Sequence, residues 1–366
     1  MVNGSNEKIT STQATVALTM TIIGVGIVTL PRVSAEEVQT ADIWISMIFS
    51  GGITLVAAFF ITKLCLRFKG MTIYQFSPIL VGKWAGFVFN LFIIMYFILV
   101  GGYQARSMAE VLRAYLLDKT PIEVVIIVYI AVGVYIVISG LYPIVKLLQI
   151  YFPVVLVFIF FMLGLSVTNV DLNNLRPVLG EGFKPVVNGI KPTTLSLAGI
   201  ESFLILIAYM QRAQQAMKAA AVGIFIPLFL YILIVIAVIG SLTVDEVRQL
   251  TWPTIELVKS IEMKFLLLER FESFFIILWV ITTFTSFIMN FYFASLGLSQ
   301  VFKKAYKPFV YGLIPFIYLC AMYPEDINGL FKLGDYIGNL AIIITGIIPV
   351  FFLTIAFIRR KRNAKN

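Results

Sequence analysis

The sequence predicts an all-α integral membrane protein with ten transmembrane helices. Of its 366 residues, 60% are apolar and only 13% are charged, whereas soluble domains average about 45–50% apolar and about 25% charged residues. The apolar residues gather in runs long enough to cross a bilayer, which takes roughly 20 residues each. Charge also alternates from loop to loop. The runs account for nearly the whole chain, so we expect a single membrane domain over residues 1–366 and no folded soluble domain.

The apolar runs are separated by charged residues, proline or glycine. The first five runs, at residues 10–167, form one expected repeat, and the last five, at 193–358, form the second. We expect the ten spans at 10–31, 43–62, 84–105, 122–139, 144–167, 193–211, 219–242, 273–300, 309–323 and 336–358.

The charges of the loops orient these spans. One set of alternate loops, together with both ends of the chain, carries sixteen Lys and Arg residues and a single acid, Glu7. The rest of the chain carries twelve Lys and Arg residues and eighteen acids. Positive residues are retained on the cytoplasmic side of a membrane, so we expect both termini to be cytoplasmic. The net charge of +9 then reflects orientation and implies no nucleic-acid partner.

The composition argues against an enzyme. The chain contains no histidine, which removes the commonest general base and the HExxH type of zinc site. No paired carboxylates, nucleophile–base set or metal-ligand cluster stands out. We therefore expect no catalytic residues, no metal and no cofactor.

Glycines interrupt the first and sixth spans. The first span reads TMTIIGVGIVTLPR, with Gly24 and Gly26 in mid-run, and the sixth reads TTLSLAGIESF, with Gly199. A glycine costs a helix about 1 kcal/mol relative to alanine, so both sites are weak points. Gly24 and Gly199 are 175 residues apart, close to half the chain. We therefore predict that helices 1 and 6 are broken at corresponding positions of two inverted five-helix repeats.

Broken helices at the middle of a membrane can hold a small ligand with their main-chain groups. The positive end of a half-helix attracts a carboxylate, and freed carbonyls accept hydrogen bonds from an ammonium group. Such a site suits a zwitterion. The alternative is that the glycines only allow the helices to pack closely.

Polar side chains inside the spans are further candidates. Glu201 lies near the middle of span 6, where a carboxyl group is costly and is by default functional. The alternative is that it is protonated, or hydrogen-bonded to a neighbouring helix for structure. In span 8, Thr282, Thr283, Thr285 and Ser286 either line a polar cavity or hydrogen-bond to their own helix.

The longest loop, residues 243–272, lies on the extracytoplasmic side in this topology. Apolar residues recur in it every three or four positions, at Ile255, Val258, Ile261 and Phe265, with charged residues between them. This spacing predicts short amphipathic helices outside the bilayer. The pattern leaves open whether they form a lid, contact lipid or dock another subunit.

Specific segments resemble the B subunits of bacterial spore germination receptors. They are spread over almost the whole chain: IIGVGIVTLPR at 22–32, LLDKTPIEVVI at 116–126, DLNNLRPVLGEG at 171–182, LTWPTIEL at 250–257, LERFESF at 268–274 and YPEDIN at 323–328. That family is similar to the amino acid, polyamine and organocation transporter superfamily. The resemblance thus implies a leucine-transporter-like 5+5 inverted-repeat fold.

The resemblance also implies a function and a site. It implies a germinant-sensing subunit of the spore inner membrane that works with an A subunit and a lipoprotein C subunit and binds an L-amino acid or another small nutrient. The ligand-binding residues it implies are Gly24, Val25, Gly26, Tyr96, Val100, Ala198, Gly199, Thr285 and Ser286, to which the mid-membrane position adds Glu201. Transporters of this superfamily do not uniformly place an acid at Glu201, so that residue departs from a plain transporter pattern.

Two functions remain open at this point. In the first, ligand binding shifts an equilibrium between two helix arrangements, and partner subunits sense the change. In the second, the chain is a secondary transporter of amino acids that uses the same broken helices for alternating access.

Overall fold

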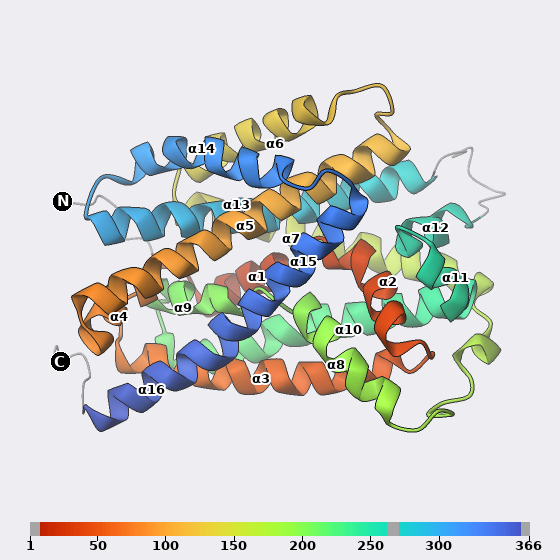
Figure 1. Ribbon diagram of the computed structural model, residues 1–366, viewed down its shortest axis with the longest axis horizontal. Helices are drawn as coiled ribbons and strands as arrows, with labels where there is room; N and C mark the ends of the chain where they lie inside the picture. The colour runs from red at the N-terminus through yellow and green to blue at the C-terminus, as the bar shows by residue number, and fades with distance from the viewer. Residues whose placement is uncertain (1–7, 262–270, 360–366) are drawn as a thin grey trace.

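The protein is a bundle of long helices. The computed structural model describes residues 8–261 and 271–359, and most of these residues are helical (Figure 1). Six helical stretches are long and apolar enough to cross a membrane: Ile43–Arg67, Lys83–Tyr115, Leu141–Asn169, Ala213–Leu242, Phe271–Phe302 and Ile327–Ile358. The chain is therefore an integral membrane protein.

Two further pairs of helices are long and apolar enough to cross a membrane only when the two members are taken together, and each pair is bent at a short break. Helices α1 (Ser11–Ile22) and α2 (Gly26–Val38) meet at 53°, and α8 (Lys184–Ser196) meets the helical segment Ile200–Tyr209, which contains α9 (Phe203–Leu206), at 45°. Both breaks fall at the glycine sites that the sequence singled out.

The remaining helices complete the bundle. In the first half they are α3 (Ile43–Arg67), α4 (Ile73–Val81), α5 (Lys83–Tyr115), α6 (Ile122–Val137) and α7 (Leu141–Ser166). In the second half they are α10 (Ala216–Leu242), α11 (Val244–Gln249), α12 (Pro253–Lys259), α13 (Phe271–Phe302), α14 (Tyr306–Met322), α15 (Ile327–Ile342) and α16 (Ile348–Ile358). A π-helical turn, Ile343–Ile347, joins the last two.

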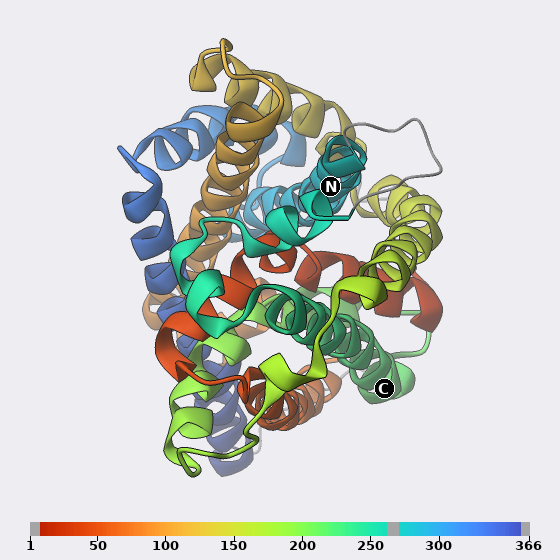
Figure 2. The ribbon, with the colours of Figure 1, turned by 90° about the vertical axis from the view of Figure 1, so that its right-hand side faces the viewer.

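Helix α1 lies in the middle of the bundle. Seen end-on in Figure 2, α1 and α2 run between α5 and α13 on one side and α3 and α10 on the other. Nine of the twelve residues of α1 are buried, and the helix contacts α7, α10 and α13. Because α1 is surrounded on all sides, none of its faces is reserved for solvent, which explains why its sequence shows little amphipathic pattern.

Several helices are longer than the apolar runs from which their spans are predicted. Helix α5 continues from 105 to Tyr115, α8 begins at Lys184 instead of 193, and α15 begins at Ile327 instead of 336. The added turns carry polar residues, and hydropathy detects only the part of a helix that suits a bilayer.

Helix α2 continues through Pro31 to Val38. Proline has no N–H group and cannot bond to the carbonyl four residues earlier, which is that of Ile27. The Thr254 hydroxyl of α12 donates to this carbonyl at 2.7 Å. A side chain from the long loop thus replaces the lost helical bond and ties α12 to α2.

The predicted amphipathic segment 243–272 contains α11 and α12. Its apolar residues Ile255, Val258 and Ile261 are buried, and α12 packs against α2, α10 and α13. The apolar face therefore covers this end of the bundle, at the right of Figure 1, which we call the α12 end. Phe265 lies outside the described residues.

The opposite end of the molecule, where α1 begins and α16 ends (Figure 1), is closed by main-chain pairing. The N–H of Ile9 donates to the carbonyl of Tyr209, and the N–H of Gln211 donates to the carbonyl of Ile9, each at 2.9 Å. The Gln211 side chain adds a bond to the carbonyl of Lys8 at 3.2 Å. We call this pairing the clasp; it joins the start of α1 to the end of the second bent pair.

Candidate ligand-binding site

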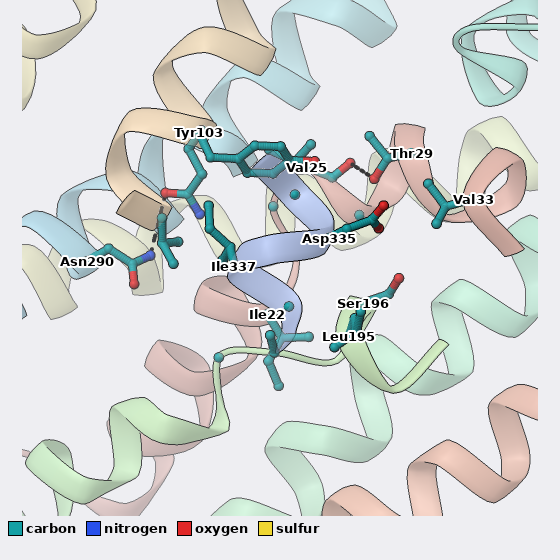
Figure 3. A pocket seen from close by; sticks show the side chains of 18 of the residues that line it. Ile22, Val25, Thr29, Val33, Tyr103, Leu195, Ser196, Asn290, Asp335 and Ile337 are labelled. Carbon is teal, nitrogen blue, oxygen red and sulfur yellow. Dashed lines mark hydrogen bonds between the residues drawn. The ribbon is translucent and has the colours of Figure 1, made fainter. Parts of the chain in front are cut away.

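A cavity of about 140 Å³ lies between the two bent helix pairs (Figure 3). Both breaks contribute to its wall, together with α5 and α15. A water molecule takes up roughly 30 Å³, so the cavity could hold about five waters or one small solute. The cavity lies beside the glycine sites at which the sequence predicts a ligand-binding site.

Most of the predicted site residues come together in the wall of this cavity. They are Gly24, Val25, Gly26, Tyr96, Val100, Ala198, Gly199 and Glu201. The breaks supply the glycines and their neighbours, and α5 supplies Tyr96 and Val100. Their role in binding a ligand stays a prediction.

Thr285 and Ser286 are placed differently from the expected site. Within the described residues, neither belongs to the cavity wall. Thr285 donates to the carbonyl of Thr282 in its own helix at 2.7 Å. Ser286 donates to the carbonyl of Thr21 at 2.7 Å and accepts from the Gln104 side chain at 2.7 Å. These bonds correct the expectation that the two hydroxyls line the cavity: one bonds within α13, and the other links α13 to α1 and α5.

Three carbonyls at the first break accept hydrogen bonds from side chains. The Tyr231 hydroxyl donates to the carbonyl of Ile22 at 3.0 Å, and the Trp279 indole donates to that of Gly24 at 3.3 Å. Together with the bond from Ser286 to Thr21, side chains of α10 and α13 thus reach three carbonyls within residues 21–24. The sequence predicts that freed carbonyls here accept from an ammonium group; these three already take a bond from the protein, and their role toward a ligand stays a prediction.

Replacing Ser286 by alanine should lower the free energy of unfolding by about 1–3 kcal/mol, because a buried carbonyl and a buried amide then lose their partner. Thermal unfolding of the purified protein in detergent measures the change. Ser166→Ala is the matched control: Ser166 is also buried, and its hydroxyl donates to the carbonyl of Leu163 in its own helix, α7. Equal stability of the two variants would contradict the linking role of Ser286.

The second break is capped by Glu201. Gly199 has φ of 130°, a conformation that glycine adopts readily and other residues rarely do. The N–H of Gly199 donates to one carboxyl oxygen of Glu201 at 2.8 Å, and the Tyr96 hydroxyl donates to the other at 2.7 Å. Glu201 is 2% exposed. Its side chain thus occupies the positive end of the second half-helix, which favours the hydrogen-bonded alternative for this residue.

The N-terminus of α2, which is the positive end of its helix dipole, lies in the cavity wall and has no side-chain cap. The first N–H groups of a helix have no partner within the helix, and Val25 at the N-cap position offers no side-chain bond to them. Val25 and Gly26 line the cavity. An anionic group in the cavity would therefore find donors and a favourable helix dipole here.

Sequence reasoning missed several wall residues. Gln104, Asn290 and Asp335 line the cavity, and the last two are labelled in Figure 3. Asp335 directly precedes the expected tenth span, 336–358. The spacing of Phe331, Asp335 and Gly338, four and three residues apart, could have revealed one face of a helix that reaches the cavity. The described residues hold no group of three or more His, Cys, Asp or Glu side chains placed to bind a metal.

The long spans, the bent pairs and the cavity between them define a membrane protein with a transporter-type fold. Mhp1, a nucleobase-cation-symport-1 family transporter solved in a closed conformation with bromovinylhydantoin bound, matches with a TM-score of 0.71 and 14% identity over 98% of this chain and 82% of that one. MhsT in complex with L-phenylalanine matches with a TM-score of 0.68 and 13% identity over 96% of this chain and 99% of that one. At these identities the likeness concerns the fold alone.

The sequence places the protein more narrowly. The family model for spore germination proteins matches residues 8–330, so the chain belongs to that family, and the predicted membership is confirmed. Similar relatives from Bacillus subtilis (strain 168) are spore germination protein YndE, 37% identical over 97% of this chain and 98% of the relative, and spore germination protein B2, 32% identical over 98% and 97%.

Proposed function

We propose that the protein is the ligand-sensing B subunit of a spore nutrient germinant receptor. It binds a small nutrient, an L-amino acid, in the cavity between the bent helix pairs and passes the change to an A subunit and a C subunit to trigger germination. The observation that carries this proposal is the cavity itself, which brings the break of one helix pair against the break of the other. Membership of the spore germination protein family supports the biological role.

The proposal includes a topology. Each bent pair is one broken span, helices 1 and 6, and the shorter apolar helices α6 and α14 also cross the membrane. With the six long stretches this gives ten spans in two inverted repeats, at 10–167 and 193–358. The charge pattern of the loops supports a cytoplasmic location for both termini, and membership of the spore germination protein family supports a place in the spore inner membrane.

A screen of ligands tests the proposal. The purified protein should be stabilised by its nutrient, because a ligand present at 100 times its dissociation constant adds about 2.7 kcal/mol to the native state. Thermal unfolding against the twenty standard L-amino acids, with sugars as further probes, measures this. Stabilisation by one amino acid or a few related ones is expected. Stabilisation by none of them would contradict an amino acid ligand.

The second candidate function is secondary transport. The similarity of the fold to Mhp1, a transporter, favours it, since alternating access uses the same broken helices. Vesicles that contain only this chain should then accumulate the labelled amino acid that stabilises it. Binding without accumulation would support the receptor and remove the transporter.

A further inference from the structure

The cavity raises the question of where a positively charged group of the ligand would bind. Three carbonyls at the first break accept hydrogen bonds from Tyr231, Trp279 and Ser286. Both carboxyl oxygens of Glu201 accept hydrogen bonds within the protein. An ammonium group placed at either position would share its acceptor with a donor of the protein. The most obvious anionic and carbonyl partners in the wall are therefore partly used before a ligand binds.

Asp335 is the other carboxylate in the wall. It lies on α15, lines the cavity and is exposed, so it marks the mouth (Figure 3). It makes no hydrogen bond or ion pair with any other residue in the described part of the chain. Beside it, Gly334 lets the Tyr103 hydroxyl come close, since a Cβ there would lie 3.1 Å from that oxygen. Asp335 thus has accessible acceptor oxygens at the edge of a space that fits a small solute.

The charges around this mouth favour a cation. No Lys or Arg of the described residues belongs to the cavity wall. The charged groups that act on Asp335 are Lys191, which attracts it, and Glu36 and Glu37, which repel it. Arg32 forms an ion pair with Glu36 at 2.9 Å and lies 4.6 Å above the ring of the wall residue Phe331. The charges of Arg32 and Glu36 therefore largely offset each other.

We propose that Asp335 recognises the ammonium group of the ligand and makes the site selective for amines and zwitterions. A zwitterion lies with its carboxylate toward the first N–H groups of α2 and its ammonium group toward Asp335. The proposal rests on the ligand site proposed above and adds to it the residue that selects the charge of the ligand. The competing partner for the ammonium group is the main chain at the carboxyl end of α8, where Ser196 and Ala198 also line the cavity.

The test compares three related probes on the purified full-length chain: the L-amino acid that stabilises it most, the amide of that amino acid, and its des-amino acid. The amide keeps the ammonium group and loses the carboxylate, and the des-amino acid does the reverse. Asp335→Asn should weaken binding of the amino acid and of its amide roughly tenfold. This fold-change corresponds to the low end of the free energy of a hydrogen bond to a charged group, and we expect the low end because Asp335 is exposed. The des-amino acid should bind no worse to the variant, and Asp335→Glu should recover part of the loss.

Two further measurements separate recognition from general effects. Glu37→Gln removes an acid near the same mouth that does not line the cavity, so it should change affinity less than twofold. The loss caused by Asp335→Asn should shrink at high salt, because exposed charges are screened.

The outcomes are distinguishable. If no amino acid stabilises the wild-type protein, both the proposed function and this inference fail. If an amino acid binds but Asp335→Asn behaves like Glu37→Gln, only the inference fails, and the carbonyls of α8 become the partner of the ammonium group. Equal losses for all three probes would show that Asp335 supports the structure and does not select charge.

Discussion

Replacing Gly199 by alanine should abolish ligand binding. Alanine at φ of 130° and ψ of −21° is strained by about 1–3 kcal/mol, and its Cβ would lie 2.8 Å from Cγ1 and 3.1 Å from the main-chain nitrogen of Ile22. Relief of this contact requires the two breaks to move apart. Because both breaks form the wall of the cavity, the site should lose its shape. Ligand-dependent thermal stabilisation and nutrient-triggered germination of spores both measure the effect.

Gly140→Ala is the matched control for this variant. Gly140 also has a positive φ, of 88°, but no atom lies within 4 Å of the position its Cβ would take. This variant should therefore also lose stability through backbone strain, and it should keep the response to the ligand. A Gly199→Ala protein that binds as well as Gly140→Ala would show that the close approach of the breaks is not needed.

Replacing Glu201 by alanine should destabilise the protein by about 2–6 kcal/mol. The change leaves the Tyr96 hydroxyl and the Gly199 N–H buried without their partner, at about 1–3 kcal/mol for each unsatisfied group. It also uncaps the second half-helix inside the bundle. Thermal unfolding in detergent without ligand measures the loss directly.

A double-mutant cycle with Tyr96→Phe isolates the bond between the two side chains. Tyr96→Phe removes one donor and should cost less than Glu201→Ala, while the double variant should cost less than the sum of the two. Glu201→Gln keeps an acceptor and should fall between the wild type and Glu201→Ala. Full additivity of the two single changes would refute a direct contribution of this hydrogen bond.

Much of the architecture follows from local properties of the sequence. Apolar runs and loop charges locate the long helices because the bilayer acts on every span in the same way. Glycines at mid-span mark the breaks near Gly24 and Gly199 because a helix is weakest where it lacks side chains. The sequence motifs that resemble the family, such as IIGVGIVTLPR at 22–32, predict membership of the spore germination protein family, and the match to the family model confirms it.

The partners of the breaks could not be predicted in the same way. Tyr231 and Trp279 lie more than 200 residues from the carbonyls they reach, and only the packing of α10 and α13 on α1 brings them there. Asp335 was missed because a helix that faces a cavity need not be apolar there, so hydropathy placed its start too late. Thr285 could not be separated from Ser286, since the rotation of α13 decides which hydroxyl meets α1.

The clasp limits how the two bent pairs can move. Main-chain hydrogen bonds tolerate only a few tenths of an ångström of stretching before they weaken, and Ile9 makes two of them, to Tyr209 and Gln211. The clasp therefore couples α1 mechanically to the Ile200–Tyr209 segment. If α1 tilts, that segment must tilt with it, or the hydrogen bonds of the clasp must break. A movement of helices at the mouth of the cavity would thus reach the clasp either as a concerted rotation of both segments or as a separation of the two strands of main chain.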